Sequence, residues 1–242
     1  MILGQLQADK SSFNKKRHID YWLRNLQTYL PAAATSNDSN RILVGFFIVS
    51  ALDLLGSLQS RTTAAERASY IDWIYQCQHP HGGFRGFTGT DFGALRSEEN
   101  SHWDPANLPA TYFALAALVV LGDDLLRVKR RECLEWVPKL QRPDGSFGET
   151  LGEGARIEGG RDMRFCNCAA GVRRILRGKR AALNQDINDV NVEGMVQYIR
   201  ASEVCSSRRS CVHPGRTLTG TTSRPMTAVF LKDLTTKPMV RT

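Results

Sequence analysis

Residues 73–84 read WIYQCQHPHGGF, and residues 136–147 read WVPKLQRPDGSF. Both stretches place Trp, Gln, Gly and Phe at one spacing, W-x4-Q-x3-G-x-F, and the second begins 63 residues after the first. Trp22 and Gln27 keep the first half of the same pattern. Recurrence at a fixed interval of this length indicates structural units that stack on one another.

Each residue type in the repeat has a structural role. The Trp anchors the end of a helix, and the Gln caps backbone groups that are free there. The Gly permits a tight turn, and the Phe returns the chain to the core. The repeat therefore predicts a helix, a turn and a return to the core in each unit.

The segments around the repeat show helical periodicity and no convincing strand. We predict helices over residues 18–30, 41–55, 63–78, 107–121, 128–140, 165–176 and 191–201. The second and fourth are apolar on nearly every side, whereas the third and fifth are amphipathic. An all-apolar helix is buried on every side, and an amphipathic one covers it from outside. The sequence thus predicts an all-α fold in which inner helices are ringed by outer ones.

Several turn and cap residues carry separate expectations. Asn107 is expected to cap the fourth helix, and Asp123 and Asp124 to cap the helix that follows them. His79 and His81 are expected in a solvated turn, because no third metal ligand lies near them in sequence.

Composition is that of a globular protein, with 42% hydrophobic and 23% charged residues in a chain of 242. The longest apolar run, residues 42–52, is 11 residues long, whereas a membrane span needs about 20. Residues 1–17 lack the apolar core of a secretory signal, and the six cysteines form no C-x-x-C pair. We expect a cytoplasmic protein with reduced, buried thiols and no membrane insertion.

The positive charge is concentrated at the C-terminal end. Residues 204–242 hold seven Lys and Arg against one acidic residue, so residues 1–203 are nearly neutral. This distribution gives little support to a nucleic-acid partner. The same 39 residues contain 12 Ser and Thr and no apolar periodicity. We predict one domain over residues 1–203 and a basic tail over 204–242, which is either disordered or encoded by a changed reading frame or retained intron.

Four segments together resemble the β subunits of the protein prenyltransferases. They are WIYQCQHPHGGFRGF, TYFALAALVVLGDDLLRV, LQRPDGSFGE and EGGRDMRFCNCA. The G-D-D-L and D-M-R-F details are most similar to type I geranylgeranyltransferase. The resemblance covers about residues 13–203, roughly the N-terminal half of such a subunit. Terpene cyclases carry related single motifs, but the D-x-D-D run of the acid-initiated cyclases is absent from this sequence.

The resemblance implies an α/α toroid, here incomplete and followed by an irregular tail. It implies transfer of a geranylgeranyl group from geranylgeranyl diphosphate to the Cys of C-terminal CaaX motifs, as in small GTPases. It also implies a zinc ion that holds this Cys as thiolate, and a separate α subunit as partner. The alternatives left open are a farnesyltransferase-type β subunit and a non-catalytic toroid fragment or scaffold.

The resemblance also suggests substrate-binding residues. Phe46, Phe47, Tyr112 and Phe113 are expected to line an apolar cavity for the isoprenoid, the alternative being that they pack only against one another. Arg164, in the D-M-R-F segment, matches a family position beside isoprenoid and peptide. Its alternative is a surface Arg at the start of a helix.

The catalytic centre of the family is not found in this sequence. Its zinc ligands, an Asp and a Cys in one segment and a later His, fall beyond the point where the resemblance ends. Cys205, Cys211, His213 and Asp233 lie in the tail but outside the family's motif context. We therefore assign no catalytic residue and no metal ligand, and we expect the chain as written to bind zinc weakly or not at all and to be inactive.

Overall fold

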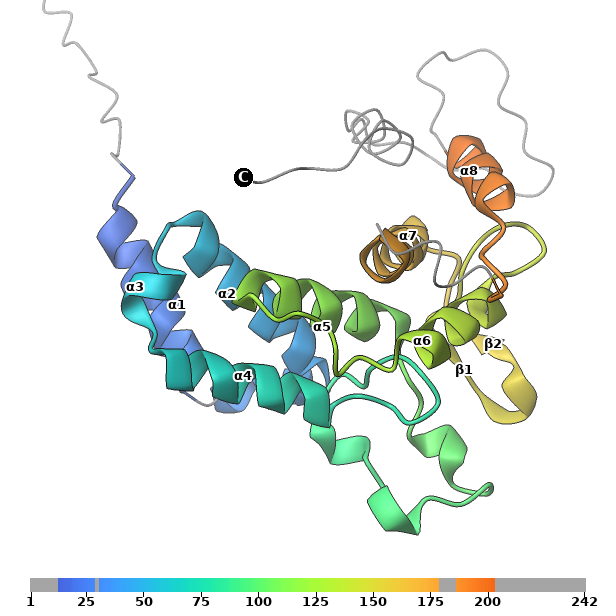
Figure 1. Cartoon of the computed structure of the whole chain (residues 1–242), viewed down its shortest axis with the longest axis horizontal. Coiled ribbons are helices and arrows are strands. Elements are labelled where there is room, and N and C mark those ends of the chain that lie inside the picture. Colours follow the sequence, from blue (N-terminus) through green and yellow to red (C-terminus); the bar gives the residue numbers. More distant parts are fainter. Residues whose placement is uncertain (1–12, 29–30, 179–185, 203–242) are drawn as a thin grey trace, which may run out of the picture.

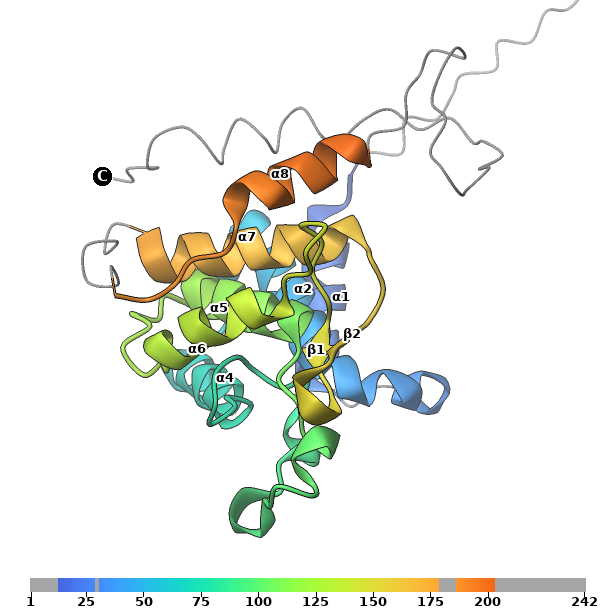
Figure 2. The same ribbon diagram turned by 90° about the vertical axis from the view of Figure 1, so that its right-hand side faces the viewer.

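The computed structural model describes residues 13–28, 31–178 and 186–202, and Figures 1 and 2 show the arrangement of its elements. The α-helices are α1 (Lys15–Gln27), α2 (Arg41–Leu54), α3 (Leu58–Arg61), α4 (Ala64–Gln76), α5 (Leu108–Leu121), α6 (Arg130–Trp136), α7 (Met163–Arg177) and α8 (Val192–Ala201). Short 3₁₀ helices are η1 (Ala32–Asn40), η2 (Thr88–Thr90), η3 (Gly93–Leu95), η4 (Ser101–Trp103), η5 (Val137–Leu140) and η6 (Glu153–Ala155). All seven predicted helices are present, and α3 was not predicted.

The helix ends follow local capping rules. Thr63 and Glu66 form the predicted capping box of α4, with the Glu66 amide donating to Thr63 Oγ1 at 3.1 Å. Asn107 Oδ1 caps α5 by accepting from the Ala110 amide at 2.9 Å. α1 begins three residues earlier than predicted because Asn14 supplies its cap. The fifth predicted helix changes from α6 to η5 beside Pro138, which has no N–H for an α-helical hydrogen bond.

The helices form the two predicted layers. α5 packs along α2 on one side and along α7 on the other, so these three are the inner helices. α1 packs on α2, α4 packs on α5, and both α6 and α8 pack on α7, as outer helices do (Figure 1). The alternation of all-apolar and amphipathic segments therefore predicted the layers of α2, α4, α5 and α6 correctly, whereas α7 is amphipathic and still lies in the inner layer.

One antiparallel strand pair was not predicted. β1 (Thr150–Leu151) pairs with β2 (Ile157–Glu158), with Thr150 opposite Glu158. Strands of two residues are too short to show the alternating pattern by which strands are recognised in a sequence. The hairpin lies between the second repeat and α7 and leaves the fold helical.

The repeat joins each unit to the next one. Gln78 Oε1 accepts from the Lys129 amide at 2.6 Å, and Gln78 Nε2 donates to the Arg127 carbonyl at 3.1 Å. In the second copy, Gln141 Oε1 accepts from the Asn191 amide at 2.7 Å and its Nε2 donates to the Asn191 carbonyl at 2.9 Å. The predicted capping role is confirmed, but each Gln caps the start of the next outer helix, where the prediction placed it at the end of its own.

The glycines of the repeat lie against the same helix starts. Gly82 has φ +101° and Gly145 has φ +85°, in the region that favours glycine. A Cβ on Gly82 would lie 2.3 Å from the Glu132 carbonyl oxygen, and one on Gly145 would lie 2.0 Å from the Gly194 carbonyl oxygen. We call residues 78–84 and 141–147 the Gln–Gly turns, because both residue types are needed for this contact.

The aromatic ends of the Gln–Gly turns complete the core. Phe84 and Phe147 are both fully buried. Each is bridged to the Gln of its own turn by a short antiparallel contact. The predicted return of the Phe to the core is confirmed in both copies. Within the described ranges, the helices are too short or too polar to cross a membrane.

A pair of glycine substitutions tests the contact between the Gln–Gly turn and the next helix. Gly122, at the end of α5, has the same φ of +85° as Gly145, but a Cβ there meets no atom within 4 Å. We expect Gly122→Ala to cost about 1 kcal/mol of unfolding free energy from backbone strain alone. Gly145→Ala should cost about 1–3 kcal/mol more, because its Cβ strikes the backbone of α8. Urea unfolding followed by circular dichroism measures both, and equal losses would contradict the contact.

Candidate functional site

Four aromatic side chains meet between two inner helices. The ring centroids of Phe46 on α2 and Phe113 on α5 lie 5.1 Å apart, and those of Phe47 and Phe113 lie 5.7 Å apart. Tyr112 adjoins Phe113 at 5.2 Å. We call these four residues the aromatic strip. The structure thus brings together the four residues that the sequence singled out as an isoprenoid lining.

Both interpretations of these aromatics have support. The rings contact one another, as packing alone requires. Phe47 is nevertheless 52% exposed, and the other three are only partly buried. An aromatic side chain left half exposed between packed helices offers apolar surface to a ligand. The lining interpretation therefore remains a prediction with a suitable surface to support it.

The strip continues onto the third inner helix. A Cβ on Gly171 of α7 would lie 2.3 Å from Tyr112 Cε2, so the tyrosine ring lies directly on the α7 backbone. Burial, with a smaller contribution from Cys168, raises the pKa of Tyr112, which stays a neutral phenol. Gly171 was not identified from the sequence. A glycine in the interior of a packed helix was the signal that could have found it.

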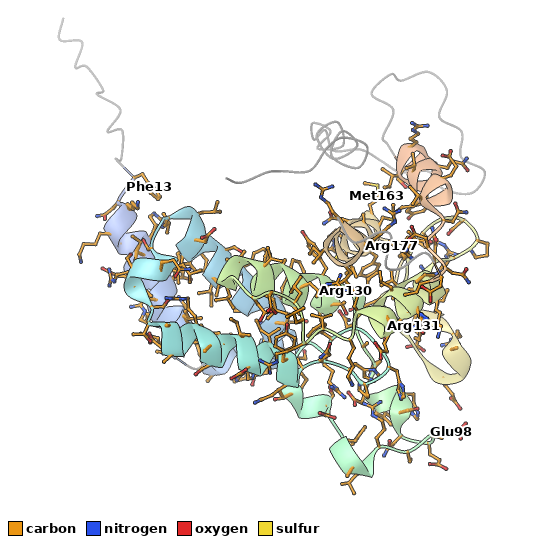
Figure 3. The ribbon with its side chains drawn as sticks, viewed as in Figure 1. Phe13, Glu98, Arg130, Arg131, Met163 and Arg177 are labelled. Carbon is orange, nitrogen blue, oxygen red and sulfur yellow. The ribbon has the colours of Figure 1, made fainter. Side chains whose placement is uncertain are left out.

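Arg164 lies in the first turn of α7, beside Met163, which Figure 3 labels. Its side chain is 85% exposed. It pairs with Asp162, the residue that caps the helix, through Nε at 2.9 Å and Nη2 at 2.7 Å. These hydrogen bonds from Arg164 hold the pKa of Asp162 below its usual value. The pair keeps a guanidinium at the exposed N-terminal end of the helix, as expected of a surface Arg at a helix start.

Arg164 also shares a helix face with the strip. Residues 164, 168 and 171 are spaced i, i+4 and i+7, which places them on one side of α7. Gly171 on that side touches Tyr112. A cationic group thus stands on the same helix face as the aromatic strip, two turns away. This arrangement suits a ligand with an anionic head and a long apolar tail.

An apolar groove borders the strip at α2. It has a volume of about 500 Å³, within the range of small-molecule sites, and it lies between α1 and α2. Tyr21 and Trp22 line it from α1, and Phe47, Ser50 and Leu54 line it from α2. Phe47 belongs to both the groove and the aromatic strip. The sequence did not reveal the α1 side, because Trp22 was identified only as part of the repeat and Tyr21 was not singled out.

The described residues do not fit a zinc site. Within residues 13–28, 31–178 and 186–202, no three His, Cys, Asp or Glu side chains lie together where they could hold a metal ion. The four tail residues considered in the sequence, Cys205, Cys211, His213 and Asp233, lie outside the described residues. We therefore derive no chemical step through zinc.

Two turn predictions need correction. His79, expected in a solvated turn, is 7% exposed, because the Arg96 side chain lies against it. Asp123 and Asp124 do not cap α6. Their Oδ1 atoms accept from the amides of Leu125 and Leu126, at 2.8 and 2.9 Å, and so stabilise a turn ahead of the helix.

Comparison with known proteins agrees with the helical layers. Residues 13–211 match the family described as the prenyltransferase alpha-alpha toroid domain. A solved structure titled Candida albicans protein geranylgeranyltransferase-I complexed with GGPP superposes with a TM-score of 0.64 at 23% identity, over 78% of this chain and 51% of that one. The predicted fold class, an α/α toroid, is confirmed.

Curated relatives match at similar identity. The geranylgeranyl transferase type-1 β subunit of Arabidopsis thaliana is 29% identical in an alignment of 211 positions that covers 81% of this chain and 54% of the relative. That of Dictyostelium discoideum is 30% identical over 79% of this chain and 55% of the relative. The farnesyltransferase β subunit of Schizosaccharomyces pombe is 29% identical over 60% of this chain and 34% of the relative. This chain spans about half the length of the first two relatives.

The buried thiols provide a test of the core around the site. Burial raises the pKa of Cys77 and Cys168 to about 12 and that of Cys133 and Cys166 to about 11. Because the thiolate is the reactive form, iodoacetamide near pH 8 should label these four slowly in the native chain and rapidly after denaturation.

The same shifts predict a pH dependence of stability. Burial favours the neutral thiol over the thiolate, so the fold keeps its full stability below the unfolded thiol pKa near 9. The free energy of unfolding then falls as the pH rises toward about 12, the folded pKa of Cys77 and Cys168. In the iodoacetamide experiment, peptide mass spectrometry identifies the cysteines that are labelled. Rapid native labelling of all four would show that the core between the layers is open.

Proposed function

Because the chain belongs to the prenyltransferase alpha-alpha toroid family, we propose that it forms part of the β subunit of a type I protein geranylgeranyltransferase. Such a subunit transfers a geranylgeranyl group from geranylgeranyl diphosphate to the Cys of a C-terminal CaaX motif. The proposal is supported by two type-1 β subunits that match about four-fifths of the chain. A farnesyltransferase β subunit matches over a smaller share.

The observation that carries the proposal is the half-open aromatic strip across the inner helices. Burial of an isoprenoid releases about 0.8 kcal/mol per CH₂, so a long apolar wall is the main requirement for binding it. Phe47, Phe113 and Tyr112 supply such a wall over α2, α5 and α7. In the proposed complex the isoprenoid lies along the strip.

Arg164 supplies the second recognition element of the proposal. A guanidinium binds phosphate and carboxylate oxygens through charge-assisted hydrogen bonds. Asp162 engages Nε and Nη2 and so orients the group without burying it. We place the anionic end of a substrate, either the diphosphate or the peptide carboxylate, near this side chain.

The remaining parts of the proposal concern the assembly. A helical α subunit would pair with the chain, and CaaX-terminated small GTPases would be the acceptor proteins, in the cytoplasm. Zinc would serve the complete enzyme, and the described residues offer it no site. We propose that residues 1–203 form the toroid unit and that this chain binds isoprenoid without catalysing transfer. Residues 203–242 lie outside the described ranges.

Binding of geranylgeranyl diphosphate to the full chain tests whether the aromatic strip contacts the isoprenoid. Phe47→Ala removes a ring that is half exposed in the free chain and covered in the proposed complex. Burying that half contributes about 1 kcal/mol, so the variant should bind about fivefold more weakly by isothermal titration calorimetry. Leu126→Ala is the control, because Leu126 is 69% exposed in a turn outside the strip. Equal affinities of the two variants would remove the strip from the site.

The same titration with farnesyl diphosphate separates the two transferase types. The type I proposal predicts tighter binding of the geranylgeranyl compound, because the longer chain buries more apolar surface. The S. pombe match favours the alternative of a farnesyltransferase-type subunit, which predicts preference for the shorter compound. Failure of both compounds to bind would favour a non-catalytic scaffold.

A second pair of variants tests the cationic end. Arg164→Ala should weaken binding of geranylgeranyl diphosphate about tenfold and leave binding of the uncharged alcohol geranylgeraniol unchanged, because only the diphosphate accepts hydrogen bonds from the guanidinium. Arg174→Ala is the matched control, an exposed arginine in the last turn of the same helix. If both compounds lost affinity equally, Arg164 would act through the fold and not through charge.

A further inference from the structure

A long loop projects from the helical layers between the first Gln–Gly turn and α5. We call residues 86–106 the projecting loop. It contains only the short turns η2, η3 and η4, and it extends away from the helices in Figures 1 and 2, with Glu98 labelled at its tip in Figure 3. Loops of this length without regular structure usually serve a function.

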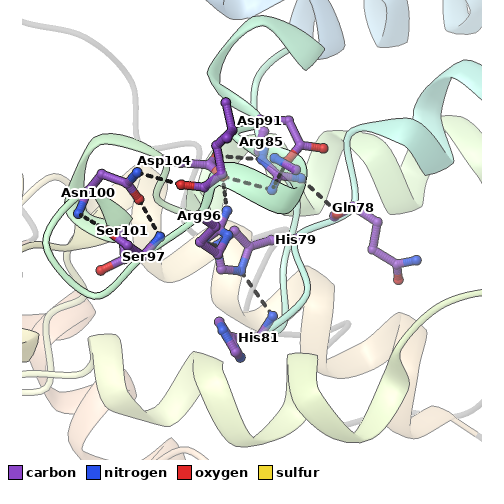
Figure 4. A network of polar contacts seen from close by, with 12 residues as sticks. Gln78, His79, His81, Arg85, Asp91, Arg96, Ser97, Asn100, Ser101 and Asp104 are labelled. Carbon is purple, nitrogen blue, oxygen red and sulfur yellow. Dashed lines mark hydrogen bonds and ion pairs between the residues drawn. The ribbon is translucent and has the colours of Figure 1, made fainter.

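A buried ionic network holds the base of the projecting loop (Figure 4). Arg85 is 1% exposed and binds Asp104, itself fully buried, through Nε at 2.5 Å and Nη2 at 2.9 Å. The same guanidinium reaches Asp91 Oδ1 at 3.0 Å and the Gln78 carbonyl at 2.8 Å. Both sides of the loop are therefore tied to the first Gln–Gly turn.

A second arginine enters the same network. Arg96 forms an ion pair with Asp104, and its Nη1 lies 2.9 Å from His79 Nε2. Burial, with the neighbouring charges of Arg96 and Arg85, lowers the pKa of His79 to about 3. The imidazole is therefore neutral and packs against Arg96 without adding a third positive charge. This contact explains the burial of His79 that the sequence did not predict.

The tip has its own hydrogen bonds. Asn100 Oδ1 accepts from the Ser97 amide at 2.8 Å, and its Nδ2 donates to the Leu95 carbonyl at 2.8 Å. Ser101 Oγ donates to the Glu98 carbonyl at 2.9 Å. These bonds fix the backbone on both sides of Glu98. The tip thus has a defined shape as well as a fixed base.

This anchoring presents two apolar side chains to solvent. Leu95 is 80% exposed and Trp103 is 69% exposed, on η3 and η4. Burying two arginines around one aspartate is costly compared with apolar packing, so the network serves placement more than stability. A loop that is costly to fix and displays Leu and Trp has the properties of a binding element, because tryptophan is prominent among residues that dominate interfaces.

The charges around these side chains have one sign. The basic residues of the network, Arg85 and Arg96, face inward and are buried or nearly so. The exposed charged residues of the projecting loop are Asp91, Glu98 and Glu99. Residues 1–203, which include this acidic surface, are nearly neutral overall. The charge pattern selects against an anionic membrane surface and favours a basic partner.

We propose that the tip of the projecting loop is a protein-docking surface, in which Leu95 and Trp103 enter an apolar pocket bordered by Lys or Arg that face Glu98 and Glu99. The inference rests on the proposed function in one respect, since the α subunit proposed above is taken as the partner that carries this pocket. The isoprenoid site does not include the loop, so the two proposals can fail separately.

The test uses the full chain co-expressed with a type I geranylgeranyltransferase α subunit, with affinity measured by biolayer interferometry. Trp103→Ser and Leu95→Ser should each weaken binding at least tenfold, because each removes an anchor from the pocket. Glu98→Lys should also weaken binding, and the loss of affinity should be larger at low salt than at high salt because the effect is electrostatic. Leu126→Ser is the control, being equally exposed outside the loop, and should bind like the unmodified chain.

Circular dichroism shows whether each variant is folded, which is expected because the changed side chains lie at the surface. Unchanged affinity of Trp103→Ser would overturn the docking surface and leave the subunit assignment intact. An unmodified chain that binds geranylgeranyl diphosphate but not the α subunit would overturn the docking proposal alone. A blue shift of tryptophan fluorescence on anionic vesicles that is lost in Trp103→Ser, without binding to the α subunit, would overturn it as well.

Discussion

The hydrogen bonds from each Gln–Gly turn to the start of the next outer helix hold the layers of this protein in register. Gln78 and Gln141 each form hydrogen bonds with two backbone groups at or just before the start of the next outer helix. Gly82 and Gly145 allow the approach, because no Cβ would fit against the facing carbonyl oxygens. The positions of α6 and α8, and through them the support of α7, depend on these contacts.

Packing of three inner helices in one row accounts for the candidate site. A row of helices buries its sides against neighbours and its back against the outer layer, so one face stays open. On that face the aromatic strip is joined to α7 where Gly171 lets Tyr112 touch the backbone. In the proposed complex, Arg164, on the same side of α7 and paired with Asp162, adds the charged group that orients the ligand. The proposed site is thus formed by residues of stacked helices and includes no residue of a long loop.

The sequence predicted what depends on neighbouring residues and missed what depends on distant ones. Caps such as Thr63 and Asn107, and the buried Phe84 and Phe147, follow local rules and were found. The burial of His79 was missed, because it requires Arg96 to fold back from a loop that has no periodicity. The partner of each repeat Gln was misassigned for the same reason, since it lies about 50 residues away. The four aromatics were found together because apolar helices converge.

The Gln–Gly contacts have a consequence for cooperativity. Each contact couples two neighbouring units, and the coupling free energy stabilises both of them equally. The array therefore resembles a one-dimensional polymer, in which a helix held on two sides opens less easily than a helix held on one. Amide protection should then be highest at α2 and α5, which pack between neighbours, and lower at α8, the last described helix to be held by such a turn.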